Sequence, residues 1–120
     1  MAGIDKLRKR RAALKGQLTQ YNTRISAIDA NTVTRPEIDT IRKRVLQIQE
    51  KLEKNSEGII DLLTDDAIIQ AQIQDQDNIE NTCADLEMRL SRREAKAIVR
   101  EKEQDIARLT TTAQTQPTQP

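Results

Sequence analysis

Histidine, tryptophan and phenylalanine are absent from this chain of 120 residues, which has one tyrosine, Tyr21, and one cysteine, Cys83. A chain with no histidine and a single cysteine lacks the usual zinc ligands and cannot form an internal disulfide. The usual groups for nucleophilic catalysis are missing, and no glycine-rich phosphate loop is present. We therefore expect neither an enzyme nor a protein with a cofactor, a metal site or a small-molecule substrate.

Proline and glycine are also scarce. Between Pro36 and Pro117 no proline interrupts the chain, and glycine occurs only at positions 3, 16 and 58. Charged residues make up 32% of the sequence and apolar residues 36%, a composition typical of long helices and coiled coils. With so few aromatic residues, we expect an elongated helical protein and no thick globular core.

Long apolar runs are missing too. No run approaches the roughly 20 residues that a membrane-spanning helix requires, so we expect no membrane insertion. The N-terminal residues are basic and polar and do not resemble a secretory signal. We expect a cytoplasmic protein, with the nucleus as the alternative location.

An apolar stripe at alternating three- and four-residue spacing predicts a first helix over about residues 4–29. Its members are Ile4, Leu7, Leu14, Leu18, Tyr21, Ile25 and Ile28. After a short polar turn, Thr34 and Glu37 stand at capping-box spacing with Pro36 between them, which predicts the start of a second helix. Because the connection is short, we expect the two helices to pack antiparallel as a hairpin.

The stripe continues from Ile38 and predicts a second helix over about residues 35–74. The first helix covers it only as far as about residue 60, because an α-helix rises about 1.5 Å per residue. Four apolar residues extend past that reach and are our candidates for self-association, which predicts a homo-oligomer. They are Ile59, Leu62, Ile69 and Ile73.

A second fold-back would cover part of this stripe within one chain. Weak helix formers at residues 55–58 and 75–78 are the two candidate positions. We favour the second, because Asp77 and Glu80 read as an N-cap signal for a third helix over about residues 78–109. Residues 110–120 contain only Thr, Ala, Gln and Pro and are predicted to be a disordered tail. The fold class is therefore all-α, an elongated antiparallel helical hairpin or coiled coil of two or three helices within residues 1–109.

Charge is distributed unevenly although the net charge is only +1. Residues 1–28 carry +6, residues 29–90 carry −7 and residues 91–109 carry +2. The basic cluster is a candidate for weak, sequence-independent binding of nucleic acid or another polyanion, and it consists of Lys6, Arg8, Lys9, Arg10, Arg11 and Lys15. The alternative is a solvated helix face whose charges pair with the acidic middle of the chain.

Two further residues stand out on the apolar stripes. Arg11 occupies a position that should be apolar, either as a device that fixes register or with its charged end bent out to water, and we favour the latter. Cys83 lies on the third apolar stripe, where we expect a small buried thiol.

A short run of sequence resembles a known family. Residues 10–19 read RRAALKGQLT, and a short turn and a charged helix with IDTI at residues 38–41 follow. This arrangement is similar to the N-terminal part of Gag-like polyproteins of BEL/Pao-type LTR retrotransposons. The resemblance implies a structural role in particle assembly through helices. Nucleic-acid binding is not implied by it, because the chain contains no Cys/His zinc knuckle.

From these observations we expect a non-enzymatic assembly module that self-associates through apolar helix stripes. Two alternatives remain open. One is a binder of nucleic acid or anionic surfaces that acts through the basic cluster, and the other is a cellular coiled-coil adaptor.

Overall fold

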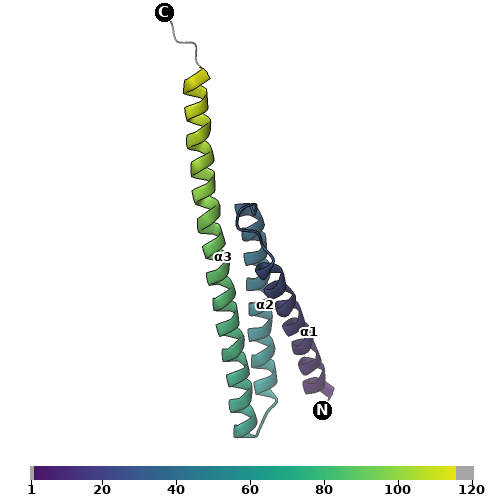
Figure 1. Ribbon diagram of the computed structural model, residues 1–120. Helices are drawn as coiled ribbons and strands as arrows, with labels where there is room; N and C mark the ends of the chain where they lie inside the picture. Colours follow the sequence, from purple (N-terminus) through teal and green to yellow (C-terminus); the bar gives the residue numbers. More distant parts are fainter. Residues whose placement is uncertain (1, 116–120) are drawn as a thin grey trace, which may run out of the picture.

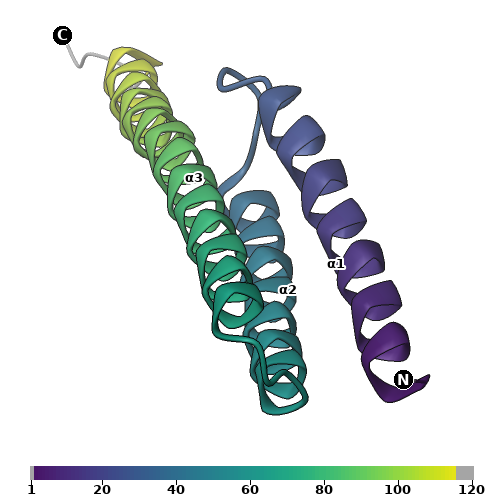
Figure 2. The ribbon, with the colours of Figure 1, turned by 90° about the horizontal axis from the view of Figure 1, so that it is seen from below.

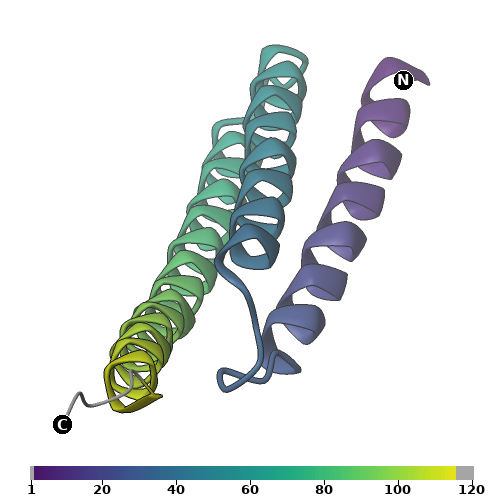
Figure 3. The same ribbon diagram turned by 90° about the horizontal axis from the view of Figure 1, so that it is seen from above.

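The computed structural model describes residues 2–115, which form three α-helices joined by short connections. α1 spans Ala2–Ser26, α2 spans Arg35–Asp61 and α3 spans Asp66–Thr115. Successive helices run in opposite directions, and α2 lies between α1 and α3 (Figure 1, Figure 2 and Figure 3). The expected all-α, elongated hairpin architecture is confirmed, with three helices in the described residues.

The bundle is a rod. It measures 88 × 21 × 19 Å, and its radius of gyration is 22.3 Å. A compact domain of this length would have a radius of gyration of about 14 Å. Much of the difference comes from α3, which continues well past the end at which α1 and α2 are joined (Figure 1).

The first turn follows the predicted chemistry. The N–H of Glu37 donates to Oγ1 of Thr34, and the N–H of Thr34 donates to Oε2 of Glu37, both at 3.3 Å. This capping box fixes the start of α2, with Pro36 in its first turn. α1 ends at Ser26, three residues before the predicted limit, while Ile28 still packs against the core.

The predicted end of the second helix near residue 74 is wrong, because the chain reverses at residues 62–65. α2 ends at Asp61. A negative charge at the C-terminus of a helix is unfavourable, because it opposes the helix dipole. Four residues later, Oδ1 of Asp65 accepts from the N–H of Ala67 at 2.9 Å and from that of Ile68 at 3.2 Å. Asp65 is therefore positioned as an N-cap for α3. Leu62 and Ile69 continue the apolar spacing across this turn. The sequence pattern therefore showed no break where the chain reverses.

The predicted third helix from residue 78 begins twelve residues too late, since both weak segments, 55–58 and 75–78, lie inside helices. In the second of them, Asp75 and Gln76 turn toward α1, so that these polar residues are satisfied without a bend. α3 continues to Thr115. Residues 116–120, which belong to the predicted disordered tail, lie outside the described residues.

The core runs along the axis between the three helices. It takes the predicted stripe residues from α1 and α2 and a third stripe from α3, in which Cys83, Leu86 and Leu90 are buried. The expectation of a buried thiol at Cys83 is thus confirmed. Burial raises the pKa of this thiol to about 11, and the charge of Glu80 acts in the same direction.

Candidate functional site

A layer of polar side chains crosses the apolar core near one end of the bundle. We call it the polar layer, and it consists of Arg11, Lys15, Asn55, Asp75 and Gln76. Each helix contributes a polar residue at a position where its stripe is interrupted. The three interruptions meet at the same height of the rod.

Arg11 is the centre of the polar layer and is only 5% exposed. Its Nε donates to Oδ2 of Asp75 at 2.8 Å, and its Nη2 donates to Oε1 of Gln76 at 2.9 Å. Its Nη1 donates to Oδ1 of Asn55 at 3.3 Å and to the carbonyl of Leu52 at 3.2 Å. The expectation that the charged end of Arg11 reaches water is therefore wrong, because partners on two other helices satisfy it inside the bundle.

Asp75 joins two cations of α1. Lys15 Nζ donates to Oδ1 of Asp75 at 2.8 Å, on the side opposite the Arg11 bond. Burial alone would raise the pKa of Asp75, but the hydrogen bonds from Lys15 and Arg11 and their charges outweigh it and lower that pKa. Asp75 is therefore held as a carboxylate between its two partners.

The predicted basic cluster is divided by this arrangement. Arg11 and Lys15 are committed to Asp75, whereas Lys6, Arg8 and Lys9 are exposed on the outer face of α1. Only part of the predicted polyanion site is thus open to a ligand.

Arg10 instead faces α2. It lines a shallow cavity of about 240 Å³ together with Lys51, Lys54, Leu7 and Asn55. No acidic residue lines this cavity, which we call the basic groove. Sequence reasoning did not group the three cations, because Arg10 is 41 residues away from Lys51.

The residues predicted for self-association are separated by the turn. Ile59 is fully buried, so its prediction as an exposed contact residue is wrong. α3 folds back beside this part of α2, where Nε2 of Gln72 donates to Oγ of Ser56, an arrangement that the expected long second helix did not allow. Ile69 is half-buried, while Leu62 and Ile73 remain 43% and 38% exposed. They flank the turn and do not form a continuous stripe.

A second apolar stripe on α3 was missed from the sequence. We call it the outer stripe, and its large members are Met88, Val99, Ile106 and Leu109. Their exposure ranges from 54% to 71%. The pattern of α3 after Leu90 is weak when it is read as a continuation of the core stripe. On the opposite face of the helix, the apolar residues keep a regular three- and four-residue spacing of their own.

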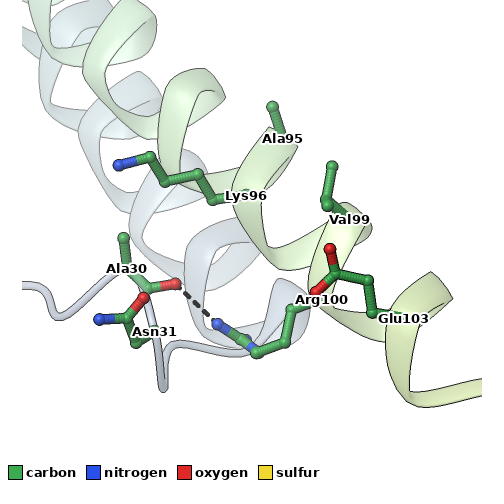
Figure 4. Close-up of a pocket in the computed structure, with 7 residues that line it drawn as sticks. All are labelled: Ala30, Asn31, Ala95, Lys96, Val99, Arg100 and Glu103. Atoms are coloured by element: carbon green, nitrogen blue, oxygen red, sulfur yellow. Dashed lines mark hydrogen bonds between the residues drawn. The ribbon is translucent and has the colours of Figure 1, made fainter. Parts of the chain in front are cut away.

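A pocket of about 450 Å³ lies between α3 and the α1–α2 connection (Figure 4). Ala30 and Asn31 line it on one side, and Lys96, Val99 and Arg100 line it on the other. Arg100 is turned away from a ligand, because its Nη1 donates to the carbonyl of Ala30 at 2.6 Å and its Nη2 donates to that of Val33. This arginine fastens the connection to α3.

Among the described residues, no three His, Cys, Asp or Glu side chains gather closely enough to hold a metal ion. None of the helices in residues 2–115 is both long enough and apolar enough to cross a membrane. Comparison of the chain with protein-family models, with curated proteins and with solved structures gave no match.

Proposed function

We propose that this chain is a non-enzymatic assembly module that associates with further copies of itself through apolar helix surface that its own fold leaves uncovered. The observation that carries the proposal is the projecting part of α3. This part of α3 extends beyond the hairpin (Figure 1). Ile106 at 63% exposure and Leu109 at 71% follow Glu101, which pairs with Arg35 at the start of α2.

The physical reason is the cost of leaving this helix uncovered. An isolated helix as short as residues 102–115 is marginal in water, and most helix stability in proteins comes from packing of an apolar face. Burial of a large apolar side chain is worth about 1.5 to 3 kcal/mol. A partner helix packed along this segment would stabilise the helix and would also bury its apolar side chains.

Sedimentation over a wide concentration range tests the proposal. We expect the mass to rise with concentration for the full chain and to stay monomeric for Ile106→Asp with Leu109→Asp. The control is Gln104→Asp with Ala107→Asp, which places the same charges elsewhere on the projecting segment and should still associate. A full chain that stays monomeric at high micromolar concentration would contradict self-association.

The resemblance of residues 10–19 to Gag-like proteins supplies a biological setting for the proposal. In such a protein, a module of this kind would hold copies of the chain together in a particle. A protease or reverse-transcriptase reading frame downstream of the coding sequence would support this origin. An unrelated genomic neighbourhood would favour a cellular adaptor with the same assembly chemistry.

The basic groove supports a second candidate, weak binding of polyanions. Arg10, Lys51 and Lys54 converge from two helices without an acidic residue in the lining of the cavity, and like charges held together favour a bound anion. Because phosphate contacts release counterions, the binding should weaken steeply as salt is raised.

Binding of a labelled DNA duplex across salt concentrations tests this candidate. Lys51→Gln with Lys54→Gln should lower the slope of log affinity against log salt by about two units. The matched control is Lys43→Gln with Arg44→Gln, which removes two exposed positive charges from the same helix outside the groove. Equal loss in both variants, or no binding at low salt, would rule out the groove as the site.

A further inference from the structure

The outer stripe follows the spacing of a coiled coil. Successive positions alternate between steps of four and three residues, and they are Met88, Arg92, Ala95, Val99, Lys102, Ile106 and Leu109. Five of these seven positions are apolar, and all seven are exposed. The outer stripe therefore has the spacing of a coiled-coil dimer interface, interrupted by the two cations Arg92 and Lys102.

The seam lies on the face of α3 opposite the core. Cys83, Leu90 and Ala97 are buried against the hairpin at a spacing of seven residues. In heptad terms they occupy position f, which points directly away from the a and d positions that form a coiled-coil contact. A helix docked on the outer stripe therefore lies on the far side of α3 from the core. The α1–α2 connection borders this contact on one side, because Ala95 and Val99 line a cavity with Ala30 and Asn31.

We propose that two copies of this chain pair through their outer stripes as an antiparallel coiled coil. This inference rests on the proposed function and adds to it the partner, the helix face and the relative direction. The contact centres on residues 100 and 101, so that the projecting part of each α3 lies along the other copy beside residues 86–100.

The two cations in the seam decide the direction. A parallel pair would place Arg92 against Arg92 of the second copy and Lys102 against Lys102, so that two layers of the contact would hold like charges. In the antiparallel arrangement, Val99 faces Lys102 of the second copy and Arg92 faces Leu109. No layer then contains two cations, and each long stem packs beside an apolar partner.

The sizes of the side chains in the outer stripe also fit the antiparallel arrangement. Ala95, the smallest residue of the seam, faces Ile106 of the second copy, so a small and a large side chain share a layer. By the two-fold axis this layer occurs twice.

The flanking charges agree as well. Lys96 and Glu103 both occupy position e, and positions e face each other in an antiparallel pair. Lys96 of each copy therefore meets Glu103 of the other copy, which gives two symmetric ion pairs. In a parallel pair, position g faces position e, and Ile98 would instead lie beside Glu103.

Disulfide trapping separates the two directions. In a Cys83→Ala background, Ala95→Cys and Ile106→Cys are made as two separate proteins, one of them tagged, and their dimeric mass is checked by sedimentation. Mixing them under mild oxidation should give the mixed disulfide almost exclusively. In the antiparallel register, identical positions lie about 16 Å apart along the axis, too far for a disulfide.

Gln104→Cys is the control, since it lies on the same helix with its side chain away from the contact. It should form no disulfide above the level of random collision. The ion pair gives a second measure: Lys96→Glu should weaken the dimer about tenfold, and Lys96→Glu with Glu103→Lys should restore it.

The outcomes distinguish this inference from the function on which it rests. Efficient disulfides between identical positions would overturn the antiparallel pair and leave self-association standing. A dimer that forms neither kind of disulfide would show that another face associates, which also overturns the inference. A monomer at all concentrations would overturn both.

Discussion

Arg11 occupies the most unusual environment of any single residue in the bundle. Arg11 is buried, while the side chain of its ion-pair partner Asp75 is 36% exposed. Such a pair is a weak source of stability, because removing charge from water costs about as much as the attraction returns. Its hydrogen bonds reach α2 and α3 at defined heights, so a shift of any helix by one turn would break them. The polar layer therefore selects one register among the many that an apolar seam allows.

Arg11→Ala should lower the free energy of unfolding by about 1–3 kcal/mol, because it leaves buried hydrogen-bonding groups without a partner. Urea denaturation followed by circular dichroism measures the change. Arg8→Ala is the matched control, since Arg8 is exposed on the same helix, and it should change the stability by less than about 0.5 kcal/mol. Equal effects of the two substitutions would contradict the structural role of Arg11.

Asp75 makes the stability depend on pH. Its pKa is lowered in the folded chain, so its contribution is present above the unfolded value of 3.8 and is lost as the pH falls through the folded value. The stability difference between the wild type and Asp75→Asn should therefore be largest near neutral pH and shrink below about pH 4. Urea denaturation at a series of pH values measures it, and a difference that is constant with pH would contradict the assignment.

Cys83 and Arg11 differ in how far the sequence predicted their surroundings. The burial of Cys83 follows from its place on an apolar stripe, a property of one helix. The environment of Arg11 depends on Asn55 and Gln76, which lie 44 and 65 residues away in the sequence. Arg11 was recognisable as an interruption, and Asn55 and Gln76 stood in the two weak segments, but the meeting of the three depends on where the chain turns.

The start of α3 has a weaker sequence signal than the start of α2. Asp65 caps it through two backbone N–H groups, whereas α2 begins with a complete capping box at Thr34. A capping box is easy to identify because it needs two residue types at a fixed spacing. A lone aspartate in an acidic segment gives no comparable pattern, and the turn at residues 62–65 was consequently missed.

Asp65→Ala should reduce the free energy of unfolding by about 0.5–2 kcal/mol, because two N–H groups lose their side-chain acceptor. Thermal and urea denaturation measure the loss. Asp65→Asn retains an acceptor oxygen and should behave much like the wild type. If Asn and Ala destabilise the chain equally, the cap is not what fixes the start of α3.

Across the whole molecule, the order and direction of the helices were predictable, whereas their lengths were not. A short capped connection determines the α1–α2 hairpin, and the length of α1 showed that a single partner helix would leave α2 partly uncovered. The fold-back resolves this by placing α3 along α2. Because the turn comes at residue 62 and not near residue 75, α3 is longer than expected and ends beyond the hairpin.

The same turn also brings opposite charges to one end of the rod. The N-terminus of α1 and the α2–α3 turn lie at the same end of the rod (Figure 1), so the basic start of α1 and the acidic residues around this turn share that end. The opposite end is formed by α3 alone.

The rod shape has a practical consequence in solution. A particle 88 Å long and 21 × 19 Å across experiences more friction than a sphere of the same mass. In gel filtration it will elute early, so that a single chain of 13.7 kDa is easily mistaken for a dimer of compact subunits. Light scattering or sedimentation equilibrium reports mass independently of shape. An antiparallel pair would lengthen the particle further, and small-angle scattering would detect it as an increase in the longest dimension with little change in cross-section.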